Sequence, residues 1–525
     1  MVWQGGRETL ILSGSRLGSR VGQNILHVEA MLDRVTNDSK TMVTGTTVAG
    51  ASRADRAGAG PGARAALWRP PAPEPPSGVR VAWWIASRQR RDLLEVLTAD
   101  VYREPVVQIP VGRRKVFVVS DPDLIRHVFV DARSRYTKSD LMRAALGPLV
   151  GEGLLVSDGS TWEHDRHMLE PALAQMRLEQ VFPMMQAAVR DHAEHLRALG
   201  DGIVIDLEEE LSRVTADIIF RAIFSEPIAG PDAAEVFAAF MRFQRAAPQF
   251  DLHVVLRSDP DNPEPSPADV VEDANKVRRL IGKLVERRRA ALARGETFAD
   301  FCQAAIEARN AHGTAFSSER LIDQLTVLFL AGHETSASAL TWAIFMLSQQ
   351  AEAMARLREE VHSHIGTRPM TFGDAKMLMW TRAVFREALR LYPPAAFLTR
   401  VAVEDGSLGD TEVPRGALII ASPWVVHRRE ALWRDADRFD PTRFGEGSAP
   451  PRTGTYIPFG LGPRVCTGAS IAQLEAQLIL AEHLRSFDFE PVYPERVWPI
   501  SRVTIRPRGG ILCRVLQRDR TRGSG

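Results

Sequence analysis

Cys466, one of the three cysteines, lies in a loop whose residue types could make its thiol reactive. The segment FGLGPRVCTG (residues 459–468) places Cys466 among glycines, close to Arg464 and directly before residues with helical apolar spacing. The helix dipole and nearby positive charge stabilise a thiolate at a helix N-terminus. Glycines give the backbone conformations that other residues avoid, so its N–H groups can point at the sulfur. We therefore predict that Cys466 is a thiolate ligand to a metal.

The kind of metal site follows from the scarcity of other ligands. The two remaining cysteines, Cys302 and Cys513, have apolar neighbours and are predicted to be buried, inert thiols. Three scattered cysteines suit neither a disulfide framework nor a four-cysteine zinc site. A macrocycle that supplies the other ligands needs only one thiolate, which indicates haem with an axial cysteine. From the residues alone, a helix-entry loop with an incidental cysteine is the alternative.

A second candidate segment lies in the middle of a long apolar stretch. Residues 321–350 are apolar on nearly every face of a helix, which predicts a helix buried on all sides. The sequence AGHET (residues 331–335) interrupts this stretch, and its polar side chains argue against a membrane span. Gly332 permits a local kink, and Thr335 can bond back to a carbonyl of the preceding turn. A buried carboxylate is costly, so Glu334 is predicted to be functional. A zinc HExxH site is excluded because residue 337 is alanine.

The two segments together resemble the motifs of the cytochrome P-450 family. FGLGPRVCTG matches the haem-binding signature FxxGxRxCxG of that family, from its phenylalanine to its closing Gly468. The resemblance implies that Cys466 is the axial haem ligand, that Phe459 shields the sulfur, and that Arg464 approaches a haem propionate. AGHET resembles the oxygen-activation motif [A/G]Gx[D/E]T. By the same resemblance, Glu334 and Thr335 are the acid–alcohol pair that relays protons to bound dioxygen.

Two further segments resemble the conserved ion-pair network of the family. EALR (residues 387–390) resembles the ExxR motif, and FDPTRF (residues 439–444) resembles the region called PERF. Together they imply a network of Glu387, Arg390 and Arg443, although Thr442 replaces the usual glutamate. Without the other motifs, a solvated ion pair on a helix is the simpler interpretation of EALR.

The remaining predicted haem contacts are also taken from the resemblance. TWEHDR (residues 161–166) resembles the WxxxR helix, in which Trp162 and Arg166 contact a propionate. Arg400 is expected on a strand as a second propionate arginine. The alternatives are a surface helix for the first and an exposed strand arginine for the second. His427 is expected to have a structural role.

The elements that must position these residues follow a recognisable order. Residues 104–129 predict two strands around residues 112–115 and a helix that opens at Asp121-Pro122. Helical periods dominate from residue 158 to 360, and short extended pieces with turns follow Pro393. A last helix is expected after Gly468, with a closing strand near Leu516. The predicted fold is mainly α with a smaller β part. The resemblance makes it the cytochrome P-450 fold, with the haem between a long central buried helix and the cysteine loop.

Composition sets limits on the class of protein. The 525 residues carry a formal net charge of +1, with 45% hydrophobic and 25% charged residues, which gives no indication of a nucleic-acid partner. Residues 1–78 are expected to be a disordered tail or the product of a mis-assigned start codon, with a targeting segment as an alternative. Residues 79–525 are expected to form a single haem domain. We expect no transmembrane anchor, and the sparse cysteines favour the cytoplasm.

The resemblance implies a soluble, bacterial-type haem-thiolate monooxygenase with haem b as cofactor and O2 as co-substrate. It would hydroxylate or epoxidise an apolar organic substrate. The expected pocket lining comes from residues 136–152, 235–265 and 394–399, from the first half of the long helix with Phe329, and from the turn near Ile500.

Separate proteins, a ferredoxin and an NAD(P)H-dependent ferredoxin reductase, would supply the electrons. A docking face with Arg166, Arg428 and Arg429 is expected for an acidic partner. A non-catalytic haem-thiolate binding or sensor protein is the alternative function, and it would need neither Glu334 nor Thr335.

Overall fold

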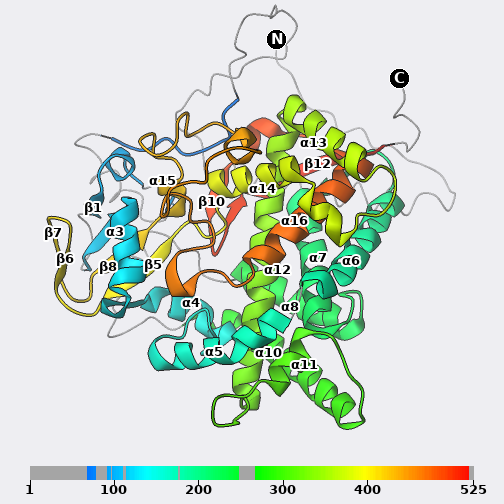
Figure 1. Ribbon diagram of the computed structural model, residues 1–525, viewed down its shortest axis with the longest axis horizontal. Helices are drawn as coiled ribbons and strands as arrows, with labels where there is room; N and C mark the ends of the chain where they lie inside the picture. Colours follow the sequence, from blue (N-terminus) through cyan, green and yellow to red (C-terminus); the bar gives the residue numbers. More distant parts are fainter. Residues whose placement is uncertain are drawn as a thin grey trace, which may run out of the picture. The chain divides into compact units, whose positions relative to one another are not determined.

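The structure is a computed structural model that describes residues 68–77, 92–95, 97–109, 114–175, 178–246 and 266–518 (Figure 1). The α-helices are α3 Pro122–Arg126, α4 Asp140–Val150, α5 Gly159–Gln175, α6 Leu178–Leu199, α7 Leu207–Phe224, α8 Pro231–Ala246, α10 Ala268–Ala293, α11 Phe301–Glu307, α12 Ser318–Ser348, α13 Ala351–His364, α14 Met379–Leu391, α15 Pro423–Val426 and α16 Ala469–Ser486. The strands are β1 Val106–Ile109, β2 Val116–Val119, β3 Tyr136–Lys138, β4 Ile203–Asp206, β5 Leu398–Ala402, β6 Gly406–Leu408, β7 Thr411–Val413, β8 Leu418–Ala421, β9 Phe487–Pro491, β10 Pro499–Ser501, β11 Ile505–Pro507 and β12 Leu512–Gln517.

The largest sheet has five strands in the order β1-β2-β8-β5-β3. Strands β1 and β2 are the two predicted strands. They pair antiparallel, and β2 also pairs in parallel with β8, far along the chain. Helix α3 begins where the Asp-Pro pair predicted it. The Asp121 carboxylate accepts hydrogen bonds from the amides of Asp123 and Leu124, and the proline occupies the first helical turn. Strand β5 carries Arg400 on this sheet, as expected.

Three smaller sheets complete the β part. Strand β12 pairs antiparallel with both β4 and β9, β6 pairs with β7, and β10 pairs with β11. The β4 strand lies within the stretch in which helical periods were predicted to dominate. The β10–β11 pair aligns Ser501 with Ile505, so residues 502–504 form its tip. This tip contacts the central helix, as described below.

Helix α12 is the long buried helix that the sequence predicted. It begins after Ser317, whose hydroxyl accepts a hydrogen bond from the Arg320 amide, and it packs against α7, α10, α14 and α16 (Figure 1). The helix is continuous through Gly332. A Cβ atom at Gly332 would lie 2.6 Å from the Ile219 side chain of α7. The glycine therefore permits close packing of α12 against α7, and the α-helix is not interrupted at this position.

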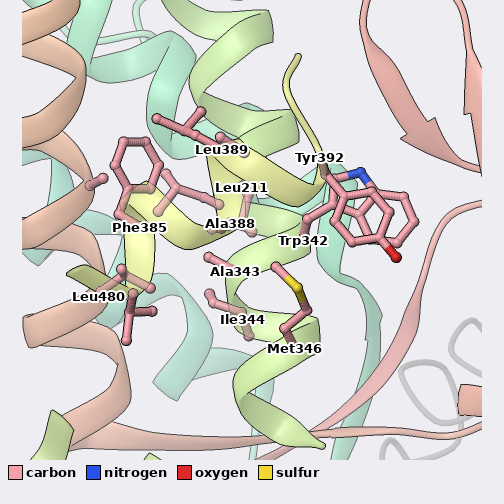
Figure 2. Packing of buried hydrophobic residues seen from close by; sticks show 14 of the residues in the cluster. Leu211, Trp342, Ala343, Ile344, Met346, Phe385, Ala388, Leu389, Tyr392 and Leu480 are labelled. Carbon is pink, nitrogen blue, oxygen red and sulfur yellow. The ribbon is translucent and has the colours of Figure 1, made fainter. Parts of the chain in front are cut away.

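The core beside α12 joins the helices that carry the predicted motifs (Figure 2). The Trp342 and Tyr392 rings stack with centroids 3.8 Å apart and an interplanar angle of 4°. Phe385 of α14 and Leu480 of α16 lie in the same cluster of buried residues. Each fully buried side chain of this size contributes about 1.5–3 kcal/mol through removal of apolar surface from water. The helices and strands given above confirm the predicted fold class, mainly α with a smaller β part.

The segment before residue 78 contacts this core. The Tyr392 hydroxyl donates a hydrogen bond of 2.7 Å to the Pro71 carbonyl, and the Trp68 ring lies edge-on to Phe345 at 5.9 Å. Both contacts involve residues that were predicted to belong to the tail. Residues 1–67 of the predicted tail lie outside the described residues.

Candidate active site

The cysteine loop is shaped by two glycines with left-handed backbone conformations. Gly460 has φ 80° and Gly462 has φ 76°, and a Cβ atom at Gly462 would lie 2.5 Å from the Phe129 carbonyl oxygen. The Cys466 amide donates a hydrogen bond of 2.9 Å to the Phe459 carbonyl, which closes the loop. Gly468 has φ −85°, which any residue can adopt. The expectation that all three glycines need special backbone conformations is therefore wrong for Gly468.

The Cys466 thiol is exposed, unlike the other two cysteines. Protein atoms nevertheless crowd one side of it, and this partial burial raises the pKa of the thiol. The Gly468 amide and the Arg166 charge act in the opposite direction. These surroundings therefore do not lower the thiol pKa by themselves, and a bound metal ion would favour the thiolate. Cys302 and Cys513 are fully buried as predicted, and burial raises the pKa of the Cys302 thiol to about 12.

A cluster of cations lies next to this loop. Lys138, Arg400 and Arg464 are close enough for the two guanidinium charges to lower the lysine pKa, which burial and this repulsion bring to about 7. Burial, followed by the charge of Arg464, lowers the pKa of Arg400 to about 10. Asp158 is the counter-charge in this cluster, and its carboxylate accepts a hydrogen bond of 2.5 Å from Arg464. The cluster therefore has more positive than negative charge.

One nitrogen of this cluster has no partner in the described part of the chain. Arg464 Nη1 is buried without a hydrogen bond, while its guanidinium lies over the Trp162 ring at 4.2 Å from the centroid. Arg400 is 8% exposed and lies over the Phe129 ring at 4.4 Å. Surplus positive charge and a spare donor beside an exposed thiol suit a metal macrocycle that carries carboxylates.

The two predicted contacts on α5 differ in their surroundings. Trp162 is 7% exposed and is stacked under Arg464, so it lies at the cation cluster. Arg166 forms an ion pair of 2.9 Å with Glu170 on the same helix, and its charge also reaches the Cys466 thiol. The structure thus brings both residues to the cysteine side of the domain.

The acid–alcohol segment of α12 has an asymmetric arrangement. Glu334 is 4% exposed, and its Oε1 accepts hydrogen bonds from the Thr504 hydroxyl at 3.0 Å and from Arg506 at 3.1 Å. Its Oε2 has no partner among the described residues. The Thr335 hydroxyl donates to the Ala331 carbonyl at 2.7 Å, as predicted, and the side chain is partly exposed. His333 is buried and donates to the Phe329 carbonyl, and burial lowers its pKa to about 4.

A hydrogen bond connects the central helix to the helix that follows the cysteine. The Ser336 hydroxyl, next to Thr335, donates 2.7 Å to the Glu475 carboxyl on α16. Glu475 is fully enclosed, and this burial raises its pKa to about 8. Helix α12, beside the AGHET segment, and the helix that follows the cysteine are therefore joined directly by a buried hydrogen bond.

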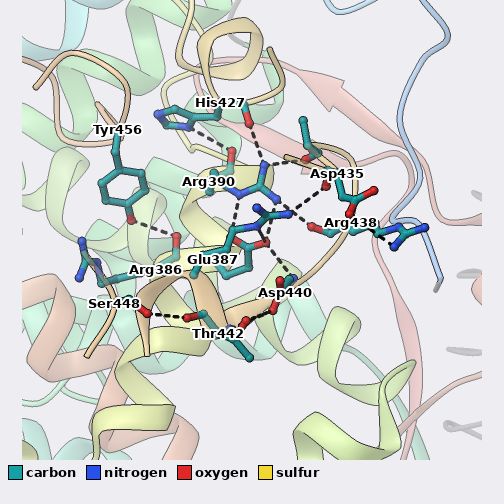
Figure 3. Close-up of polar contacts among 12 residues, drawn as sticks. Arg386, Glu387, Arg390, His427, Asp435, Arg438, Asp440, Thr442, Ser448 and Tyr456 are labelled. Carbon is teal, nitrogen blue, oxygen red and sulfur yellow. Dashed lines mark hydrogen bonds and ion pairs between the residues drawn. The ribbon is translucent and has the colours of Figure 1, made fainter. Parts of the chain in front are cut away.

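The predicted ion-pair network is present and almost fully satisfied (Figure 3). Glu387 and Arg390 are completely buried and form two parallel hydrogen bonds of 2.7 Å. Arg443 is the third member, although its Nε lies 3.5 Å from the Glu387 carboxylate. His427 donates from Nδ1 to the Arg390 carbonyl and accepts from the Ile457 amide at Nε2. Its expected structural role therefore agrees with its contacts.

Comparison with known proteins identifies the family. The family model "Cytochrome P450" matches residues 73–514, which is most of the chain. The chain belongs to the cytochrome P450 family. As a member of this family it is a haem-dependent monooxygenase with haem b as cofactor and O2 as co-substrate. Cytochromes P450 bind organic substrates and depend on redox partners for their electrons.

The chain is similar to P450 enzymes from plants and from a bacterium. It is 31% identical to cytokinin hydroxylase of Arabidopsis thaliana over 406 residues, which cover 75% of this chain and 77% of the relative. It is 30% identical to cyclooctatin synthase of Streptomyces melanosporofaciens over 438 residues, which cover 81% and 91%. The crystal structure of the cytochrome P450DA heme domain has the same fold, with a TM-score of 0.70 and 21% identity, over 86% of this chain and 99% of that one. In the described part of the P450 chain, no helix has the length and hydropathy of a membrane span.

Two sequence predictions about the surface and the pocket are wrong. Arg428 and Arg429, expected to meet a redox partner, are 7% and 9% exposed. Arg428 lies against the Trp424 ring at 3.4 Å, and Arg429 donates to the Ser120 hydroxyl. Phe329 packs edge-on against Phe220 and Phe240 in the core, so it does not line a pocket. Of the expected lining, residues 247–265 lie outside the described residues.

Three residues near the site were not predicted from the sequence. Lys138 joins the cation cluster from β3, and Thr504 and Arg506 reach Glu334 from the β10–β11 hairpin. The family motifs do not include these positions. The nearest signal in the sequence was the expected pocket turn near Ile500, which precedes the hairpin tip.

Proposed function

We propose that this P450 hydroxylates or epoxidises an apolar organic substrate with a haem ligated by Cys466. The observation that carries the proposal is the exposed Cys466 thiol beside a cluster with surplus positive charge. Haem b would take Cys466 as its protein ligand, and the cation cluster around Arg400 and Arg464 would hold its two carboxylates. Bound haem supplies the activation of dioxygen, while the protein supplies orientation and a water-poor environment.

Each predicted site residue then has a role that its contacts support. Arg400 and Arg464 would hold the propionates, and the Trp162 ring lies under the Arg464 guanidinium. Arg166 would be a further cation near the thiol. Lys138 is an addition to the predicted set of cations. The Phe459 carbonyl accepts a hydrogen bond from the Cys466 amide, and the Gly468 amide donates to the thiol. With these backbone contacts, Phe459 and Gly468 would close the loop around the sulfur.

Glu334 and Thr335 would deliver protons on the side of the haem at which dioxygen binds. Their presence on one turn of α12 favours turnover over a non-catalytic sensor, which would need neither group. The names of the similar proteins support this choice, since one is a hydroxylase and another is a synthase.

The electron source and the location complete the proposal. Electrons would come from a separate ferredoxin and an NAD(P)H-dependent ferredoxin reductase. A bacterial-type, cytoplasmic enzyme agrees with the three cysteines, all of which are unpaired as in a reducing compartment. The apolar substrate class rests on the partly exposed Ala395, Phe397 and Leu398.

The haem ligand is tested by the reduced carbon-monoxide difference spectrum of the purified protein. We expect the red-shifted thiolate band in the wild type and its loss in Cys466→Ala. Cys302→Ala is the matched control, because that thiol is buried in the core, and it should retain the band. A wild type without the band, or a Cys466→Ala variant that keeps it, would overturn the proposal.

The monooxygenase reaction is tested by NAD(P)H-driven turnover with surrogate ferredoxins and a panel of apolar compounds. Thr335→Ala should uncouple electron use from product formation while the thiolate band is unchanged. If the coupling were unchanged as well, Thr335 would have no part in proton delivery. A protein with the thiolate band and no oxygen uptake would favour the sensor alternative.

A further inference from the structure

A small pocket is lined in part by Glu334, whose Oε2 has no partner among the described residues. It is lined by Phe243 and Gln244 of α8, by Leu330 and Glu334 of α12, and by the hairpin residues Arg502, Val503 and Arg506. The pocket is partly enclosed and has room for about one water molecule. Three segments that are distant in the sequence therefore meet at this carboxylate.

Two polar groups that line this pocket, one from Glu334 and one from Gln244, have no protein partner among the described residues. Glu334 Oε2 is buried without a hydrogen bond, and so are both amide atoms of Gln244, as far as the described residues extend. A buried polar group without a partner costs about 1–3 kcal/mol. Two such groups in one water-sized pocket are the arrangement that an ordered water molecule satisfies.

The other carboxylate oxygen is unsuited to proton uptake. Oε1 accepts from the Arg506 guanidinium, which stays charged and does not pass a proton on. Arg506 also forms an ion pair of 3.3 Å with Glu208 at the start of α7, and both partners are mostly buried. The Thr504 hydroxyl donates to the same Oε1 and accepts from Arg506 Nε at 3.3 Å. Arg506 and Thr504 therefore orient the carboxylate and leave Oε2 free to face the pocket.

We propose that Gln244 holds a water molecule against Glu334 Oε2, and that this water is the entry site for the protons consumed in turnover. The proposal rests on the proposed function and assigns Gln244 as a positioning residue. The water donates one proton to Oε2 and regains one from solvent, and the carboxyl group then passes its proton on towards Thr335 and the oxygen-binding side. The water and the carboxylate thereby both return to their starting states. The overall reaction consumes a substrate C–H bond, O2, two electrons and two protons, and it releases the hydroxylated product and water.

The water site is tested first, by high-resolution crystal structures of the wild type and of Gln244→Leu. Leucine has a similar size and no hydrogen-bonding atoms. We expect a water within hydrogen-bond distance of both Gln244 and Glu334 Oε2 in the wild type, and its loss in the variant. A wild-type pocket without this water would overturn the proposal, whatever the state of the haem.

The proton entry is tested by oxygen uptake of the haem-loaded protein, driven by NADPH with a surrogate ferredoxin and its reductase, in H2O and in D2O. This measurement needs no identified substrate. We expect Gln244→Leu to slow oxygen uptake by about tenfold and to raise the solvent isotope effect. Gln180→Leu, at an exposed position of α6, is the matched control and should change neither quantity.

Further variants separate the proposal from a loss of folding. Gln244→Asn keeps the amide and should recover part of the rate, and it also serves if the leucine variant does not fold. An intact thiolate band with unchanged uptake and isotope effect in Gln244→Leu would overturn the proton entry and leave the proposed function standing. Loss of the thiolate band in the wild type would instead contradict the proposed function.

Discussion

Glu387 and Glu334 are both buried helix carboxylates that face an arginine, and they differ in how completely they are paired. Glu387 accepts from Arg390 at both oxygens and also from the Asp440 amide, and it is 0% exposed. Glu334 has both partners on one oxygen and none on the other. A carboxylate whose oxygens all have hydrogen-bond partners has no atom left to bind a ligand or a proton, which suits a purely structural role. A carboxylate with one unpaired oxygen keeps an atom that can accept a proton, and the unpaired buried atom lowers the stability of the fold.

The complete network should show the largest effect on stability. Arg390→Leu leaves the Glu387 charge buried and also removes the donor to the carbonyls of His427, Ala436 and Arg438. We expect a loss of about 3–5 kcal/mol in the free energy of unfolding, measured by urea denaturation of the apoprotein. Arg386→Leu on the same helix is the control, because its guanidinium lies over the Phe444 ring, and it should cost about 1 kcal/mol or less. Equal losses of unfolding free energy in the two variants would show that the Glu387–Arg390 pair contributes no more to stability than an arginine outside the pair.

Glu475 sharpens the comparison because, among the described residues, it has one unpartnered oxygen, like Glu334, and no cation in contact. Burial raises its pKa from 4.5 to about 8, so the folded state holds a proton that the unfolded state releases between these values. Its contribution to stability is therefore complete below about pH 4.5 and is lost as the pH rises towards 8.

Glu475→Gln should remove this pH dependence. Relative to the variant, the wild type should lose on the order of 2 kcal/mol of unfolding free energy between pH 6 and pH 8. Denaturation curves of both proteins across this range give the difference, in which the other titrating groups cancel. Parallel curves would show that Glu475 keeps an ordinary pKa.

The incomplete site should show the smallest effect on stability. In Glu334→Gln, the amide oxygen can still accept from Thr504 and Arg506, while Arg506 keeps its ion pair with Glu208. We expect a change below about 1 kcal/mol in urea denaturation, together with slower oxygen uptake in the haem-loaded enzyme. A loss as large as that of Arg390→Leu would mean that Glu334 also belongs to the structural frame.

Local signals allowed much of the fold to be predicted. The Asp121-Pro122 pair predicted the start of α3, and the continuous apolar pattern predicted α12, because helix starts and periodicity depend on neighbouring residues. The motifs likewise indicate Glu387, Arg390 and Cys466, because their residue types and spacing are local features of the sequence.

The partners of the site residues were not predictable in this way. Asp158 binds Arg464 across 306 positions of the chain, and Arg506 meets Glu334 across 172. Such pairs depend on how the elements pack, and neither residue type is unusual in its own segment. Arg428 shows the reverse error, since a charged residue in a polar segment was expected at the surface and is buried against Trp424.

The contacts of Trp68 and Pro71 have a practical consequence for preparing the enzyme. A shortened chain that starts at residue 79, the boundary expected from composition, would leave the Tyr392 hydroxyl without its acceptor and the Phe345 ring without one of its aromatic neighbours. Both rings border the Trp342 stack at the centre of the core. A truncated form intended for expression and crystallisation should therefore begin upstream of Trp68.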